Sequence, residues 1–154
     1  MKRFILTICS ILFVWNTFGQ QGDNKPNIIL IVADDLGFAD LSLNGSKQIK
    51  TTNIDRLANG GINFTQGYVS APVCSPSRAG FLTGRNQVHF GHDNNIGGNQ
   101  PGFDAQYLGL PLSETTIATR LQQLGYSTGL IGKWHLGTAP QFHPLKRGFD
   151  EFWG

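Results

Sequence analysis

One apolar run constrains the fold of this chain more than any other feature of its 154 residues. Residues 27–33, Asn-Ile-Ile-Leu-Ile-Val-Ala, are rich in β-branched side chains and do not alternate with polar ones. Such a run is typical of a central strand that is covered on both faces, as in parallel sheets. It ends abruptly at Asp34 and Asp35. Ligand sites in open α/β sheets lie beyond the carboxyl ends of strands, so this acidic pair is a candidate site; a turn with a helix cap explains it equally well.

The rest of the chain alternates between predicted helices and further strands. Capping residues, apolar spacing and terminating glycines predict helices over residues 52–59, 76 to 82 or 83, and 114–124. Apolar runs predict strands over residues 62–69 and 127–131. The first helix is expected to turn Ile54 and Leu57 inward, and the third to be capped by Ser113 and to bury one apolar face. This order of strands and helices indicates an α/β protein.

The first residues predict export. Lys2 and Arg3 precede an apolar stretch that is short for a membrane span and ends in small residues. We therefore expect a signal peptide over residues 1–19, a lead-in over residues 20–25, and a periplasmic or secreted protein without stable membrane insertion; a membrane anchor is the rival interpretation. The formal charge of +2 falls to zero without the two leader cations, so no basic stripe indicates nucleic-acid binding.

Cys74 is the one cysteine outside the predicted leader. A lone thiol in an exported protein closes no internal disulfide and calls for an explanation. It lies just before a predicted helix N-terminus, which favours an anion, and Arg78 follows one helical turn later. Lys133 and His135 follow another predicted strand, at a spacing that places both on one side of an extended chain. Each residue taken singly also fits a structural role, such as a buried inert thiol, a surface cation or a core histidine.

Several segments of the chain resemble the type I sulfatase family, and they follow one another in the family order. Cys74-Ser-Pro-Ser-Arg78 with the residues up to Gly84 is similar to the first sulfatase signature. The other similar segments are residues 26–37 (first strand and metal loop), 125–128 with 132–137 (second signature) and 147–150. Separate motifs in order are far more specific than one motif alone. Residues 26–154 are therefore identified as the N-terminal part of a sulfatase catalytic domain, truncated at its end.

This resemblance implies a fold, a modified residue and a metal ion. The family has an alkaline-phosphatase-like α/β sandwich with a mixed, largely parallel central sheet. A separate formylglycine-generating maturation enzyme oxidises the cysteine that corresponds to Cys74 to formylglycine (3-oxoalanine), which would account for the lone thiol. By the same resemblance, Asp34, Asp35 and the modified Cys74 would bind Ca²⁺.

The resemblance also implies a reaction, the hydrolysis of sulfate esters, in sulfated glycans or aryl sulfates. The hydrated aldehyde at position 74 would attack sulfur, and its second hydroxyl would then lose a proton and expel sulfate. Arg78 would stabilise the formylglycine, Lys133 would hold the sulfate oxygens, and His135 would assist sulfate release. These roles fit the local physics, because fixed cations stabilise the negative charge that a sulfuryl group spreads over its oxygens.

Family members run to several hundred residues and carry further metal ligands and a second catalytic His and Lys downstream. We therefore expect this chain to be an incomplete fragment that is poorly folded or inactive alone. The alternatives are a phosphonate- or phosphate-ester hydrolase of the same superfamily, an inactive fragment or non-catalytic anion-binding module, and, least favoured, a cysteine hydrolase.

A long polar loop over residues 85–110 is a candidate lining for the substrate pocket, because long loops in compact domains are often functional. His89, His92, Asn94 and Asn95 would then contact a sugar. A solvated surface loop explains the same composition equally well.

Overall fold

A computed structural model describes residues 25–97 and 104–154 of the chain. The chain divides into two compact units, residues 1–35 and residues 36–154. The predicted signal peptide and all but the last residue of the lead-in lie outside the described residues. None of the helices in the described ranges has the length and apolarity needed to cross a membrane.

The described part of the first unit runs extended to a turn at Asp34 and Asp35. The strand predicted over residues 27–33 does not form: no strand pairs with this run in the described ranges, and Ile29 and Ile31 are 84% and 81% exposed. A run of β-branched residues can adopt extended dihedral angles by itself, but a strand also needs a neighbour to complete its hydrogen-bond ladder. The second aspartate, Asp35, has a left-handed backbone with φ of +56°, a conformation that Asp tolerates better than most residues.

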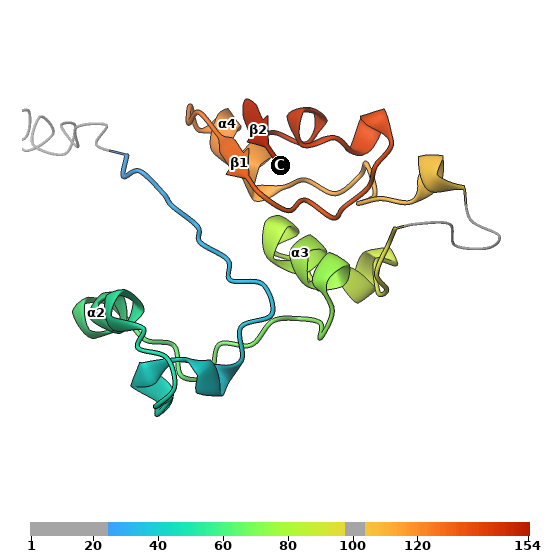
Figure 1. The fold of residues 1–154 in the computed structure, drawn as a ribbon. Helices are drawn as coiled ribbons and strands as arrows, with labels where there is room; N and C mark the ends of the chain where they lie inside the picture. Colours follow the sequence, from blue (N-terminus) through green and yellow to red (C-terminus); the bar gives the residue numbers. More distant parts are fainter. Residues whose placement is uncertain (1–24, 98–103) are drawn as a thin grey trace, which may run out of the picture. The chain divides into compact units, whose positions relative to one another are not determined.

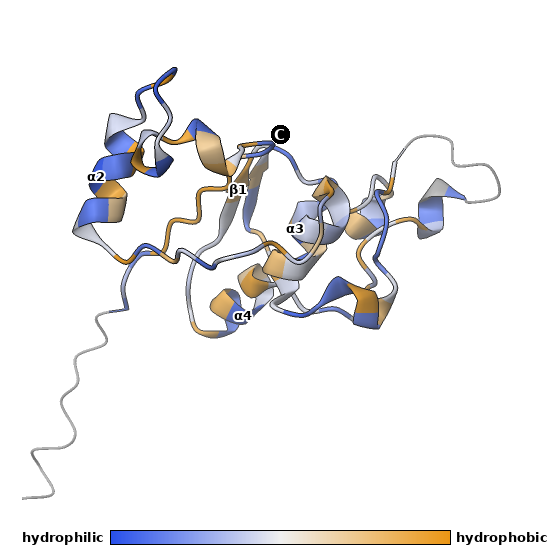
Figure 2. Ribbon diagram, turned by 90° about the horizontal axis from the view of Figure 1, so that it is seen from below, coloured by the Kyte–Doolittle hydropathy of each residue, from blue (hydrophilic) through white to orange (hydrophobic). Residues whose placement is uncertain are grey.

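In the second unit, helix α2 (Thr52–Gly60) confirms the first predicted helix, with Thr51 at its N-cap. The expectation that Ile54 and Leu57 turn inward is wrong, because they are 43% and 71% exposed. Figure 2 shows both hydrophilic and hydrophobic parts on α2. In the described ranges this helix packs chiefly against the short turn Ser42–Asn44, which leaves both side chains open to solvent. The strand predicted over residues 62–69 does not form either; this segment is irregular and exposed.

Helix α3 (Cys74–Thr83) begins two residues before the predicted start and ends as predicted. Gly84 terminates it in a left-handed conformation, φ +67°, and donates its N–H to the Gly80 carbonyl at 2.9 Å. Pro76 lies within the first turn, where its missing N–H leaves no helical bond unmade. The helix therefore includes Cys74 rather than following it.

Helix α4 (Ile117–Gln123) begins three residues later than predicted, because Thr116 and not Ser113 is its N-cap. The Thr116 hydroxyl accepts the Thr119 N–H at 3.2 Å and donates to the Arg147 carbonyl at 2.6 Å. A distant segment of the chain thus fixes where this helix starts. Its buried residue is Ala118. The apolar face expected to be buried consists of Ile117, Leu121 and Leu124, which are half-buried or exposed.

Two short strands, β1 (Gly129–Ile131) and β2 (Glu151–Trp153), pair in parallel with Leu130 opposite Phe152. They lie side by side in Figure 1. β1 falls within the strand predicted over residues 127–131, whereas β2 was not predicted. Short 3₁₀ turns complete the described elements, at Phe38–Asp40, Ser42–Asn44, Gln87–Phe90, Ala105–Tyr107, Pro140–Phe142 and Pro144–Lys146.

The core of the second unit joins α3, α4 and the segment that follows β1. Trp134 packs edge-on against Phe149, with ring centroids 6.0 Å apart. The Phe149 side chain is buried, at 8% exposure, whereas Trp153 is 72% exposed. The buried core residues are Ala79, Leu82, Leu110, Ala118, Trp134, Leu136 and Phe149. The parallel strand pair and the helices of this unit accord with the predicted α/β class.

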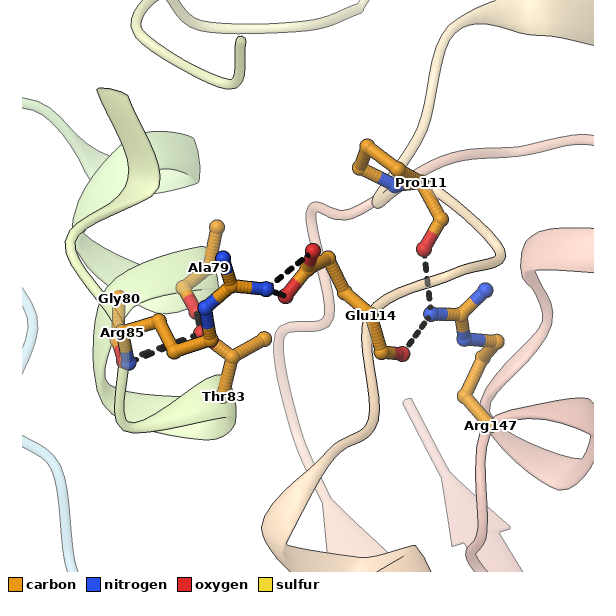
Figure 3. A network of polar contacts seen from close by, with 7 residues as sticks. All are labelled: Ala79, Gly80, Thr83, Arg85, Pro111, Glu114 and Arg147. Atoms are coloured by element: carbon orange, nitrogen blue, oxygen red, sulfur yellow. Dashed lines mark hydrogen bonds and ion pairs between the residues drawn. The ribbon is translucent and has the colours of Figure 1, made fainter. Parts of the chain in front are cut away.

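A polar network crosses the same unit (Figure 3). Glu114, 8% exposed, accepts two hydrogen bonds from Arg85 Nη1, at 2.6 and 2.7 Å. Arg147, 4% exposed, donates through Nη2 to the backbone carbonyls of Glu114 at 2.8 Å and Pro111 at 3.0 Å. Burial lowers the pKa of Arg147, and the negative charge of Glu114 acts in the opposite direction. The network joins the end of α3 to the segments before α4 and before β2.

Candidate functional site

Helix α3 presents Cys74 in its first turn, half-buried and not in a disulfide. The N-cap residue, Val73, has no side-chain acceptor to offer. Instead Asn95, twenty residues further along the chain, accepts the Ser75 N–H on Oδ1 at 2.9 Å. The remaining N–H groups of the first turn leave this end of the helix suited to an anion.

Arg78 lies one turn further along α3 and links the helix to the segment after β1. Its Nη1 donates to the Lys133 carbonyl at 2.6 Å. The structure therefore brings together Cys74 and Arg78, on one helix, with the segment that carries Lys133 and His135. Sequence spacing predicted each pair separately; the tertiary fold joins the two.

The segment after β1 is not extended, so the reason given for placing Lys133 and His135 on one side is wrong. Gly132 has φ of +99° and His135 has φ of +58°. These two left-handed residues turn the chain, and the alternation rule holds only in extended backbone. Lys133 and His135 nevertheless line one cavity of about 580 Å³, together with Trp134, Leu108 and other residues.

The side chain of His135 is held by one ring nitrogen. Nε2 lies 2.7 Å from the Ile96 carbonyl. A carbonyl oxygen can only accept, so Nε2 carries a proton and, in the neutral ring, Nδ1 is the basic nitrogen. Nδ1 is buried and has no hydrogen-bond partner within the described ranges. A buried nitrogen with an unused lone pair is able to take a proton from a bound molecule.

Asp34 and Asp35 belong to the other unit of the chain, at the turn that ends its extended segment. Consecutive carboxylates provide the hard oxygen ligands that Ca²⁺ prefers. Their function as metal ligands, and that of Cys74, stays a prediction.

Among the residues of the polar loop, His92 was assigned wrongly from the sequence. It is 4% exposed, and its Nε2 lies 2.7 Å from the Ser75 hydroxyl, so it cannot reach a sugar in solvent. Burial is the main cause that lowers the pKa of His92; the Gly109 backbone and Asp93 raise it, and His135 lowers it further. No local pattern distinguishes a buried histidine from an exposed one in a polar loop.

Ser75 is a further residue that sequence reasoning missed. It is fully buried, and its hydroxyl donates to the His135 carbonyl at 2.7 Å. Its position between Cys74 and Pro76 in the signature was the one available hint. Through Ser75 and Arg78, α3 makes two hydrogen bonds to the backbone of the segment after β1.

The arrangement suits the binding of a tetrahedral anion. A helix N-terminus and a guanidinium supply fixed positive potential, and guanidinium groups bind oxyanions strongly. Lys133, one of the residues that line the cavity, adds an ammonium group. The functions expected of Cys74 as the reactive residue and of His135 stay predictions.

Comparison with known proteins matches this chain to one family. The model of the Sulfatase family matches residues 26–154. The chain is 50% identical to human arylsulfatase D over 136 residues, which is 84% of the chain and 23% of that protein. It is 42% identical to human steryl-sulfatase, covering all of the chain and 27% of that protein. The mouse N-acetylgalactosamine-6-sulfatase is 44% identical over 84% of the chain and 25% of its own length.

Solved structures are also similar to the chain. The crystal structure of Ps i-CgsB superposes with a TM-score of 0.75 at 48% identity, over 85% of this chain and 29% of that one. The PsFucS1 sulfatase from Pseudoalteromonas sp. gives 0.68 at 36% identity, over 89% and 27%. The expected fold class, the alkaline-phosphatase-like α/β sandwich of sulfatases, is thereby confirmed. The chain spans about a quarter of the length of the curated relatives that it matches.

Proposed function

Because the chain belongs to the sulfatase family, we propose that the protein carrying it hydrolyses sulfate esters. The observation that carries the proposal is the connection of α3, with Cys74 and Arg78, to the segment with Lys133 and His135 by the hydrogen bond from Arg78 to the Lys133 carbonyl. This single unit holds a nucleophile position, two cations and a proton acceptor.

The proposal includes the conversion of Cys74 to formylglycine by a separate maturation enzyme. One hydroxyl of the hydrated aldehyde attacks sulfur and displaces the alcohol by breaking the ester S–O bond. The second hydroxyl then loses its proton, the aldehyde re-forms, and the C–O bond to sulfate breaks. The position of Cys74 supports this role, because it is half-buried in the first turn of α3, where the helix dipole favours a developing negative charge.

The proposed metal is Ca²⁺, held by Asp34, Asp35 and the modified Cys74. The donor set fits, since Asp34 and Asp35 are hard oxygen donors at one turn and Ca²⁺ takes six to eight oxygens. When bound, the ion polarises the sulfuryl group and orients it. The remaining ligands would be water or other oxygens, which Ca²⁺ also accepts.

Three side chains of this chain then act on the substrate. Arg78 neutralises charge beside position 74, and Lys133, which lines the cavity, binds the sulfate oxygens. His135 accepts a proton on Nδ1, the nitrogen that its contact with the Ile96 carbonyl leaves basic. The attacking hydroxyl must lose a proton, and the leaving alcohol must gain one.

A sulfated glycan is the favoured substrate class. A structure similar to this chain, at 47% identity and a TM-score of 0.75, is Ps i-CgsB in complex with k-i-k-neocarrahexaose. Aryl sulfates remain useful as chromogenic probes. An exported location accords with such a substrate, and it rests on the predicted signal peptide.

The test uses the protein as purified from its native host. Its mass establishes whether Cys74 has become the lighter aldehyde, and hydrolysis of a chromogenic aryl sulfate measures turnover. We expect Cys74→Ala and Lys133→Ala to abolish or strongly reduce turnover, and chelation of Ca²⁺ to do the same. Lys146→Ala is the matched control, because Lys146 is an exposed lysine of the same unit outside the cavity lining.

Equal turnover in the parent and Cys74→Ala would refute the proposal. So would a clear preference for a phosphodiester over the sulfate ester, which would favour the phosphate-ester hydrolase instead. An intact thiol with no turnover would favour the non-catalytic module.

A further inference from the structure

His135 has a strained backbone that other parts of the fold must hold. Its φ of +58° is one of two positive values at non-glycine residues in the described ranges. Such a conformation costs about 1–3 kcal/mol and persists only where the surroundings determine it. The residues on either side are fixed by burial, since Leu136 is fully buried and Trp134 is 7% exposed.

The peptide of His135 itself is held by a chain of two hydrogen bonds. The Ser75 hydroxyl donates to the His135 carbonyl at 2.7 Å, and the Ser75 oxygen lies 2.7 Å from His92 Nε2. Ser75 is fully buried and His92 is 4% exposed, so water does not compete for these groups.

Counting protons along this chain fixes its direction. The His135 carbonyl can only accept, and Ser75 has one hydroxyl proton, which is used on that carbonyl. The Ser75 oxygen must then accept from His92, so Nε2 of His92 carries a proton. The Gly109 backbone also contacts this ring and raises its pKa, and a second proton on Nδ1 would leave the direction of the bond to Ser75 unchanged. If Nε2 were an acceptor instead, the two oxygens of Ser75 and His135 would face each other without a proton between them.

We propose that His92 is a positioning residue, which orients the Ser75 hydroxyl and thereby holds the backbone of His135 in its left-handed conformation. The role of His135 rests on the proposed function; the hydrogen-bond chain does not. His92 touches neither substrate nor reacting atoms in this scheme. It acts through Ser75 on His135, whose buried Nδ1 has no hydrogen-bond partner among the described residues.

The first arm of the test measures kinetics in the protein from its native host, matured and with its metal. His92→Leu removes the donor, whereas His92→Gln retains an amide N–H near the Nε2 position. Misplacement of a catalytic group lowers kcat more than it raises KM, and one lost hydrogen bond supports a fall of about tenfold. We expect that fall for His92→Leu, with KM within about twofold of the parent, and most of the activity restored in His92→Gln.

A matched control separates positioning from general loss of stability. Thr83→Val removes another buried hydroxyl of α3, one that donates to the Ala79 carbonyl at 2.7 Å and lies away from His135. We expect it to keep the parent kcat. An unchanged kcat in His92→Leu, equal losses in His92→Leu and His92→Gln, or an equal loss in Thr83→Val would each overturn the proposal. Formylglycine content is measured in every variant, so that poor maturation is not mistaken for poor positioning.

The second arm does not depend on sulfatase activity. Nitrogen-15 NMR of histidine-labelled protein at neutral pH reports which ring nitrogen of His92 is protonated, with His92→Gln identifying its signals. We expect the Nε2–H form, and we expect the His135 ring signals to move in His92→Leu and in Ser75→Ala but not in Thr83→Val. An Nδ1–H form of His92, or unmoved His135 signals, would overturn the inference even if the protein is a sulfatase. An inactive parent that shows the expected NMR pattern would refute the proposed function alone.

Discussion

Gly148 provides the sharpest test of how the second unit is packed. It has φ of +93°, and a Cβ built on it would lie 2.7 Å from Thr119 Cα and closer still to Thr119 N and Oγ1. Because two of these atoms are backbone of α4, they cannot rotate away. Gly148→Ala should therefore carry two separate costs, one conformational and one steric.

The conformational cost of a left-handed alanine is about 1–2 kcal/mol. Overpacking against a helix adds about 1–3 kcal/mol, so the total loss of unfolding free energy is about 2–5 kcal/mol. Gly45 is the matched control, because its φ of +101° is nearly the same and nothing lies within 4 Å of its Cβ position. Gly45→Ala should carry the conformational cost alone.

Urea unfolding of the purified protein, with both variants measured beside the parent, compares the two losses. We expect a clearly lower midpoint for Gly148→Ala than for Gly45→Ala. Equal midpoints would show that the backbone before β2 can move away from α4, and the packing argument would then fail.

Three further changes test other contacts of the same unit. Asp150 accepts the Thr128 N–H at 2.7 Å, and this backbone hydrogen bond is the main cause that lowers the pKa of Asp150. The stabilisation is therefore present above the unfolded pKa near 3.8 and is lost as pH falls through the lower folded value. Asp150→Asn should lower the urea midpoint at pH 7 by a margin that shrinks towards zero in acid, and a margin independent of pH would contradict this. Trp134 donates Nε1–H to the Phe142 carbonyl at 2.9 Å, so Trp134→Phe should cost about 1–3 kcal/mol by leaving that carbonyl unpaired, measured by thermal unfolding, and no change in stability would count against the bond. Arg147→Met should lower the free energy of unfolding by about 2–4 kcal/mol, because two buried backbone carbonyls lose a charged donor. Denaturant titration measures this loss, and a variant as stable as the parent would mean that apolar packing compensates.

Local sequence predicted α2 and the end of α3. Gly84 ends α3 in the left-handed conformation that glycine adopts without strain. The pairing of Cys74 with Arg78 on one helix also follows from spacing alone, because a helical turn repeats within four residues. The family resemblance carried by the ordered motifs needed no structure either.

Elements that depend on a distant partner were not predictable from the sequence. The apolar run at residues 27–33 has every residue that a strand prefers and remains unpaired in the described ranges, since a ladder requires a second chain segment. β2 was missed because three residues at Glu151–Trp153 carry too short a pattern. The start of α4 was misplaced because its N-cap, Thr116, is fixed by the Arg147 carbonyl.

The candidate site divides in the same way. Its chemical groups, Cys74, Arg78, Lys133 and His135, were identified from residue type and order, because reactivity belongs to the side chain. Their arrangement was decided by the tertiary structure, which replaced the expected extended segment with a left-handed turn at His135. His92 shows the reason most clearly: burial and the proton demands of its neighbours give it a role, and neither is encoded within a few residues of it.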